Sequence, residues 1–240
     1  MNGRPYTLLS CSMSLDGYLG GPSAERLILS NDADLDRVDE ARAGVDAIMV
    51  GAATVRLDDP RLLVRDEGRR RTREQRGLPA QPVKVTVTRC GRLDPGAAFF
   101  TAGEAPKLVY CPSPTAADLR ARLDGLATVV DGGEPVCMRA LSEDLHVRGV
   151  RRLMVEGGGS LHTQFLTDGL ADELQLVVAP LFVGDARARR FVGEGRFPWH
   201  AAQRARLVDV RRIGDVALLR YALSDRYDGA DRYDGQVSAT

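Results

Sequence analysis

The chain has 240 residues, 44% of them hydrophobic, which is enough for one large α/β domain or two small ones with a sizeable core. Its 33 basic and 33 acidic residues give a formal net charge of zero, which argues against a general nucleic-acid or membrane-surface binder. The sequence has neither a signal peptide nor an uncharged apolar stretch of the ~18 residues that spanning a bilayer requires, so we expect a cytoplasmic protein without membrane contact.

The cysteines and histidines show no metal-binding pattern. Cys11, Cys90, Cys111 and Cys137 are far apart, and so are the three histidines. No two cysteines have the C-x-x-C spacing that would place both thiolates on one zinc ion. We therefore expect buried or half-buried free thiols in a reducing compartment, and no metal.

Short runs rich in Val, Ile or Leu, each bounded by Gly, Pro or Asp, predict buried β-strands. In chain order these runs are 6–12, 45–50, 83–88, 107–111, 127–130, 152–156 and 174–178. A last pair, 206–212 and 216–221, is separated by Ile213-Gly214-Asp215. This pair predicts an antiparallel hairpin with glycine in its turn.

Apolar residues at helical spacing predict helices between the strands. Segment 32–43 has Leu35, Val38 and Ala41 at this spacing, with Asn31 or Asp32 as its N-cap. Segments 115–123 and 160–168 follow the same pattern. Strands that alternate with helices and end in a hairpin predict one α/β domain over residues 1–223, with a mixed, mostly parallel sheet covered by helices on both faces.

Two segments do not resemble core. Residues 65–81 are arginine-rich and almost without apolar residues, which predicts an exposed loop; a phosphate-binding role is the alternative. Residues 224–240 are polar and rich in glycine, with the sequence Asp-Arg-Tyr-Asp-Gly at 225–229 and again at 231–235. We expect this tail to be disordered.

The strongest local signal is Glu156-Gly157-Gly158-Gly159-Ser160, which follows a predicted strand and opens a predicted helix. Glycines let the backbone approach a ligand closely, and the N–H groups and partial positive charge of a helix N-terminus suit a phosphate. The spacing matches neither the Rossmann fingerprint nor a Walker loop, and a tight strand-to-helix turn is the alternative interpretation.

Two acidic residues follow strand ends. Glu156 stands at the carboxyl end of its strand, where α/β sheets bind their ligands, so it could accept hydrogen bonds from a substrate or transfer a proton; a solvated acid is the alternative. In segment 50–60 a strand ends in small residues, which indicates a close approach. There Thr54 could cap the next turn or contact a ligand, and Asp58 precedes an Asp-Pro dipeptide, although an ordinary turn explains the pattern equally well.

Four segments, taken together and in this order, carry a resemblance. They are SMSLDG at 12–17, DAIMVGAATVRLDDPRLLVR at 46–65, VEGGGSLHTQFL at 155–166 and DELQLVVAPLFVG at 172–184. They resemble the C-terminal reductase domain of the riboflavin-biosynthesis protein RibD and its stand-alone relatives. The resemblance implies a single-domain, dihydrofolate-reductase-like fold and a homodimer. It also implies NADPH-dependent reduction of the ribosyl group of a 5-amino-6-(5-phosphoribosylamino)pyrimidine to the ribityl form.

The resemblance also assigns residues by position. It places the catalytic role on Glu156 and Asp58 and substrate binding on Arg42, Leu62, Arg65 and Glu156, where the two arginines suit a ribose phosphate. The cofactor-binding residues would be Ser12, Thr54, Asp58, Thr88, Gly157, Gly158, Gly159, Ser160 and Leu161. We add Arg89 from its charge alone, as a partner for the 2′-phosphate of NADPH. A solvated surface position is the alternative for each arginine.

One departure from the family pattern leaves the substrate open. Position 10, where these reductases usually carry Lys, is Ser10. A dihydrofolate-reductase-like reductase that acts on a pterin or a secondary-metabolite substrate is therefore one alternative. A non-catalytic nucleotide-binding protein that kept the glycine loop is another. The choice between a deaminated and a diamino pyrimidine, and between NADPH and NADH, also stays open.

Overall fold

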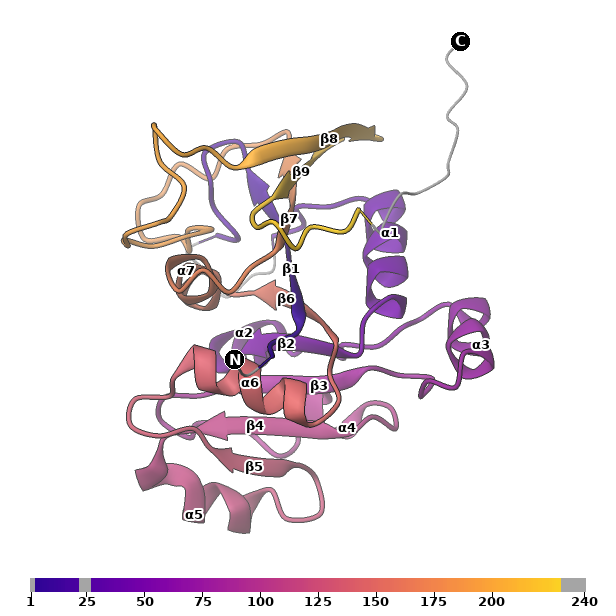
Figure 1. The fold of residues 1–240 in the computed structure, drawn as a ribbon, viewed down its shortest axis with the longest axis vertical. Coiled ribbons are helices and arrows are strands. Elements are labelled where there is room, and N and C mark those ends of the chain that lie inside the picture. The colour runs from indigo at the N-terminus through magenta and orange to yellow at the C-terminus, as the bar shows by residue number, and fades with distance from the viewer. Residues whose placement is uncertain (1–2, 22–26, 230–240) are drawn as a thin grey trace.

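A nine-stranded sheet runs through the computed structural model, which describes residues 3–21 and 27–229 (Figure 1). Its strand order is β5-β4-β3-β2-β6-β1-β7-β9-β8. The strands are β1 (Tyr6–Ser14), β2 (Ala47–Gly51), β3 (Val83–Val87), β4 (Lys107–Cys111), β5 (Thr128–Asp131), β6 (Arg152–Gly157), β7 (Glu173–Ala179), β8 (Arg206–Ile213) and β9 (Val216–Ala222). All nine strands lie within one or two residues of their predicted bounds.

The sheet is mixed in the way that the sequence predicts. Strands β1 to β7 are parallel to their neighbours, and the hairpin β8–β9 joins antiparallel to β7. Strand β6 lies in the middle, between β2 and β1. The carboxyl ends of these three strands therefore meet at one edge, which is where open α/β sheets bind ligands.

Helices cover both faces of this sheet. They are α1 (Asp32–Ala43), α2 (Ala52–Asp58), α3 (Glu67–Gln75), α4 (Ala98–Thr101), α5 (Ser113–Arg122), α6 (Met138–Val147) and α7 (Gly159–Thr167). Strand β2 shows how one run of apolar residues serves two cores: Met49 packs with residues of α6 and α7, whereas Ile48 and Val50 pack with residues of α1, α2, α4 and α5. Side chains alternate between the faces of a strand, so a strand that is buried on both faces must be apolar throughout.

Residues 65–81 are not the exposed loop that their composition predicts, because they contain helix α3. The Asp66 side chain accepts a hydrogen bond from the N–H of Arg69 and caps the helix, and arginine is a good helix former. Arg73 is buried and donates to the carbonyl oxygens of Ala43 and Val45, which fastens α3 to the chain between α1 and β2. The segment 50–60 likewise contains helix α2 rather than a simple turn.

The expected disorder from residue 224 onward does not extend over residues 224–229. The hydroxyl of Ser224 donates to Asp172 at 2.6 Å, Arg226 lies 3.3 Å from the same carboxylate, and Asp228 pairs with Arg152 at 2.8 Å. The remainder of that tail, residues 230–240, lies outside the described residues.

The thiols are only in part as expected: Cys11 and Cys111 are buried, but Cys90 and Cys137 are exposed, and none forms a disulfide. Within residues 3–21 and 27–229, no helix combines the length and hydrophobicity needed to cross a membrane. In the same part of the chain, no group of three or more His, Cys, Asp or Glu side chains is arranged to hold a metal ion.

Candidate active site

A cleft of about 500 Å³ opens at the edge where β1, β2 and β6 end. Strand β1 contributes Ser12, helix α1 contributes Arg42, and β6 contributes Glu156. The cleft thus brings together six of the residues that the sequence singles out: Ser12, Arg42, Thr54, Asp58, Leu62 and Glu156.

Glu156 is held by a two-pronged ion pair with Arg42. Both carboxylate oxygens accept hydrogen bonds from the guanidinium, at 2.6 Å each, and the third nitrogen of Arg42 donates to the carbonyl oxygen of Leu63. Burial alone would lower the pKa of Arg42, but the charge and hydrogen bonds of Glu156 raise it above its ordinary value. Because all three nitrogens are engaged, Arg42 fixes the orientation of Glu156 in the cleft.

Helix α2 presents Thr54 and Asp58 to the cleft from one face, because they are four residues apart. Gly51, at the end of β2, is the N-cap residue, so the helix starts directly at the carboxyl edge of the sheet. The Thr54 hydroxyl accepts a hydrogen bond from the N–H of Gly158 at 3.3 Å. This bond joins α2 to the glycine loop.

The glycine loop turns directly from β6 into helix α7. Gly157 has φ of +146°, a conformation that side chains disfavour, and a Cβ on Gly159 would overlap the carbonyl oxygen of Arg190. Among the described residues, no hydrogen bond occupies the N–H groups of Gly159 and Ser160. The start of α7 can therefore bind an anion, although two of its glycines are also needed for backbone geometry and packing.

A second cavity, of about 690 Å³, adjoins the cleft and shares Leu35, Arg42, Asp58, Pro60 and Leu62 with it. Its distinctive feature is a set of cationic side chains, Arg61, Arg65 and Arg70. The two cavities adjoin, and Glu156 lines only the first, whereas Arg61, Arg65 and Arg70 line only the second.

The second cavity is supported by the buried carboxylate of Asp39 on α1. Burial acts to raise the pKa of Asp39, but hydrogen bonds from the N–H groups of Arg65 and Asp66 and from the Arg69 side chain hold it below its usual range. The Arg65 guanidinium lies 3.4 Å from Asp39 and donates to the carbonyl oxygen of Leu35, and it remains more than half exposed. Arg65 is thus anchored at the rim of the cavity.

Three other candidates lie elsewhere. Thr88 is buried, and its hydroxyl accepts hydrogen bonds from the N–H groups of Cys90 and Gly91, so it stabilises the turn after β3. Arg89 is exposed beside it and lines neither cavity. The side chain of Leu161 packs in the hydrophobic core, which leaves only its backbone for a ligand.

Arg189 is a cleft residue that the sequence analysis did not identify. It lies in a segment without regular structure after β7, and one of its nitrogens is 3.6 Å from an Asp58 oxygen. The three arginines within residues 187–190 were the available signal, but composition alone cannot tell which of them turns inward.

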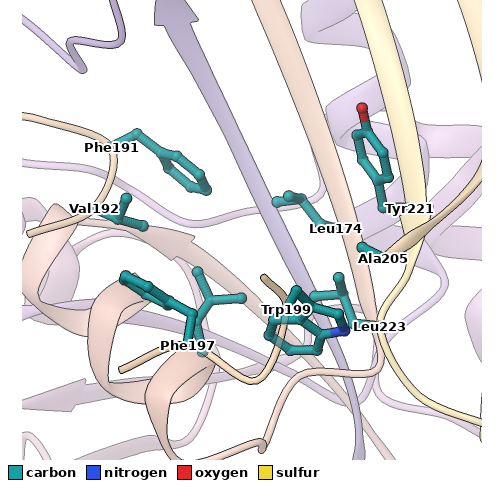
Figure 2. Close-up of a pocket in the computed structure, with 9 residues that line it drawn as sticks. Leu174, Phe191, Val192, Phe197, Trp199, Ala205, Tyr221 and Leu223 are labelled. Carbon is teal, nitrogen blue, oxygen red and sulfur yellow. The ribbon is translucent and has the colours of Figure 1, made fainter. Parts of the chain in front are cut away.

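An apolar pocket of about 280 Å³ lies apart from this cleft, between helix α7, strands β7 and β9 and the segment 191–205 (Figure 2). Phe191, Phe197 and Trp199 line it together with aliphatic side chains. It has no charged side chain, so it does not fit a phosphorylated ligand.

Comparison with known proteins identifies the family of the chain. Residues 5–219 match the family model described as the RibD C-terminal domain. The chain belongs to the RibD C-terminal domain family. The family resemblance read from the four sequence segments is therefore confirmed.

Relatives in this family include two proteins named 2,5-diamino-6-ribosylamino-4(3H)-pyrimidinone 5′-phosphate reductase. The protein from Archaeoglobus fulgidus is 37% identical over 213 residues, which is 88% of this chain and 95% of that protein. The protein from Methanothermobacter thermautotrophicus is 36% identical over 92% of this chain and 99% of its own length. Because the relatives are reductases, the prediction of an oxidoreductase is confirmed.

Solved structures confirm the dihydrofolate-reductase-like fold of the RibD reductase domain. RibD from Acinetobacter baumannii superposes with a TM-score of 0.72 at 28% identity; the match covers 91% of this chain but only 58% of that longer protein. A pyrimidine reductase-like protein from Corynebacterium diphtheriae has a TM-score of 0.75, with 91% of each chain covered, and at 21% identity it supports the fold alone.

Proposed function

We propose that the chain reduces the ribosyl group of a 5-amino-6-(5-phosphoribosylamino)pyrimidine to the ribityl group, with NADPH as hydride donor, in riboflavin biosynthesis. One observation carries the proposal: the carboxylate of Glu156, fixed by Arg42, faces a cleft that continues into an arginine-lined cavity. A ligand with a polar sugar and a terminal phosphate matches this distribution of charge. The names of the two reductases favour the diamino form of the pyrimidine.

The residues around the glycine loop fit a nicotinamide dinucleotide. The N–H groups of Gly159 and Ser160 at the start of α7, beside the Thr54–Gly158 hydrogen bond, can donate to phosphate oxygens. Ser12, Thr54 and Asp58 would hold the polar groups of the cofactor that lie in the cleft. When bound, the cofactor supplies the hydride.

The chain's own residues orient the substrate. We assign to Glu156 hydrogen bonds with the hydroxyl groups of the sugar and to Arg42 the positioning of that carboxylate. Arg65, assisted by Arg61 and Arg70, would bind the phosphate at the far end. Reduction of the open-chain imine adds one hydride to carbon and one proton to nitrogen, and we assign assistance of that proton to Asp58 or Glu156, two carboxylates that line the cleft.

The test follows NADPH oxidation spectroscopically with the phosphorylated diamino pyrimidine, its deaminated counterpart and a dihydropterin, each repeated with NADH. We expect turnover with a phosphorylated pyrimidine, and mass spectrometry should show a product that has gained two hydrogens. Turnover with the dihydropterin alone would establish the first alternative. Tight NADPH binding without turnover on any substrate would establish the non-catalytic one.

We also infer a homodimer. Strand β8 lies at the edge of the sheet and exposes Leu207 and Val210, whose relative exposures are 50% and 57%, and such an edge favours association. Light scattering coupled to size-exclusion chromatography measures the assembly directly, and a monomer at all concentrations would contradict the inference. A location in the cytoplasm stays a prediction.

A further inference from the structure

Arg189 belongs to a segment whose backbone is fixed against the turn that follows β1. The Asp16 carboxylate accepts hydrogen bonds from the N–H groups of Val183 and Gly184, and the N–H of Leu19 donates to the carbonyl oxygen of Arg189 at 2.7 Å. The N–H of Phe191 donates to Gly17 in turn. These bonds hold the backbone of Arg189 in place, although the segment is neither helix nor strand.

Within residues 3–21 and 27–229, the guanidinium of Arg189 makes no hydrogen bond. Its Nη2 lies 3.6 Å from Asp58, which is beyond hydrogen-bond distance, and 3.0 Å from where a Cβ on Gly20 would stand. Glycine at position 20 therefore leaves room for it. Arg42, by contrast, directs each of its three guanidinium nitrogens to Glu156 or to Leu63.

The surroundings of Arg189 point toward the glycine loop. The carbonyl oxygen of the next residue, Arg190, packs against Gly159, and Thr54, one helical turn before Asp58, bonds to Gly158. The chain next to Arg189 therefore packs beside the start of α7, while the Arg189 guanidinium lies in the cleft near Asp58. It does not line the second cavity, which contains the arginines proposed for the substrate phosphate.

We propose that Arg189 binds the diphosphate of the dinucleotide cofactor, opposite the N–H groups that begin α7. The inference rests on the proposed use of a nicotinamide dinucleotide and adds a residue to it. A guanidinium can bind two phosphate oxygens at once, and its charge offsets the repulsion between Asp58 and the anionic diphosphate. The N–H groups of Gly159 and Ser160 bind from the other side.

The experiment measures NADPH binding by isothermal titration calorimetry, so that no turnover is needed. For Arg189→Gln we expect the dissociation constant to rise by about tenfold, the usual effect of losing one charge-assisted hydrogen bond. Arg189→Lys should raise the dissociation constant less, because lysine keeps the positive charge but cannot donate two parallel hydrogen bonds to a phosphate. Inorganic pyrophosphate should compete with NADPH in the unaltered protein and much less in Arg189→Gln.

Arg187→Gln is the matched control, since Arg187 is in the same segment, is 82% exposed and pairs with Asp185 at 2.7 Å. It should bind NADPH as the unaltered protein does. An unchanged dissociation constant in Arg189→Gln overturns the inference and leaves the proposed function intact. Unchanged NADPH binding with a raised KM for the phosphorylated pyrimidine also overturns it, in favour of the substrate phosphate. An unaltered protein that binds neither NADPH nor NADH would overturn the proposed function itself.

Discussion

At Glu156, position and orientation have separate causes. The end of β6 brings the side chain to the ligand edge of the sheet, but only the two hydrogen bonds from Arg42 decide which way the carboxylate faces. Arg42 is on α1, far away in the sequence, so the motif around Glu156 could not reveal this partner. Arg42, one of the two arginines that the resemblance assigns to the substrate, thus also positions Glu156.

Replacing Glu156 with Gln should lower kcat by about a hundredfold or more, the range for a lost acid–base group. The amide keeps the shape of the side chain but can no longer accept two hydrogen bonds from Arg42 or carry charge. Calorimetry should show nearly unchanged NADPH affinity, because the cofactor contacts proposed above do not include this side chain. Equal losses of turnover and of cofactor affinity would contradict the assigned role.

Position 159 must be glycine because of packing, whether or not a ligand binds there. Gly159→Ala should destabilise the fold by about 1–3 kcal/mol, the usual cost of overpacking, because the new Cβ would push the Arg190 carbonyl away from α7. Urea unfolding followed by circular dichroism measures the loss. Gly193→Ala is the control, since a Cβ there meets only Thr163 at an ordinary 3.7 Å. Equal effects of the two substitutions would show that the contact with Arg190 is unimportant.

The sequence motifs identified those site residues whose position depends only on the nearby chain. Glu156 stands at the end of its strand, and Thr54 and Asp58 lie on the short helix that follows another, so a predicted strand end places all three near the ligand edge. Arg189 could not be found in this way, because its place depends on hydrogen bonds between residues 183–191 and the turn after β1. Thr88 also follows a strand, yet its hydroxyl is used by the turn, which only the three-dimensional structure reveals.

At the scale of elements, strands were easier to predict than helices. Most strands of this sheet are short apolar runs, which stand out because both of their faces are covered; β8, at the edge, was found instead from its pairing with β9 across a glycine turn. Helices α2, α3 and α4 are short or polar and have no long apolar stripe. Helix α6 had a usable signal, since its buried Met138, Leu141 and Leu145 are at helical spacing, and this signal was overlooked.

Helix α4 shows how a single turn of helix can be kept in place. The Asp59 carboxylate accepts a hydrogen bond from Ala98 at its N-terminus, and the fully buried Lys84 donates to the carbonyl oxygens of Phe99 and Ala102 at its C-terminus. Asp59, the C-cap residue of α2, thereby anchors the end of the helix from which its neighbour Asp58 faces the cleft. Burial lowers the pKa of Lys84 to about 8.

This lowered pKa predicts a stability difference between the protein and a Lys84→Met variant. Between the folded pKa near 8 and the unfolded value of 10.5, the unfolded chain binds more protons, so the free energy of unfolding rises with pH in this window. The variant lacks this contribution, whereas the titrating tyrosines and cysteines are common to both proteins. Urea unfolding at pH 7.5 and pH 10 should therefore show the advantage of the unaltered protein increasing with pH. A constant difference would mean that Lys84 does not titrate in this range.

At the scale of the whole molecule, one buried histidine makes the free energy of unfolding depend on pH in the acidic range. His162 of α7 is fully buried against Phe191, and burial lowers its pKa to about 4, an effect that the carbonyl groups of Val155 and Phe191 partly offset. The folded protein therefore keeps this ring neutral at pH values where the unfolded chain protonates it.

As pH falls from 6.5 to 4, His162 should cost the fold about 3 kcal/mol, since one pKa unit corresponds to about 1.4 kcal/mol. In His162→Leu this part of the acid sensitivity should disappear, while the contribution of the carboxylates remains. Denaturant unfolding of both proteins at pH 7 and pH 4.5 provides the measurement. Parallel losses in the two proteins would exclude His162 as the origin.

The apolar pocket beside α7 has an optical consequence. Trp199 is the sole tryptophan of the sequence, and it lies among the residues that continue the chain from Arg189 and pack onto α7 (Figure 2). Its emission spectrum therefore reports on one environment, the pocket in which the segment 191–205 packs against α7. Loosening of that segment would shift the emission to longer wavelengths without any added dye, and energy transfer to a bound reduced nicotinamide would quench it.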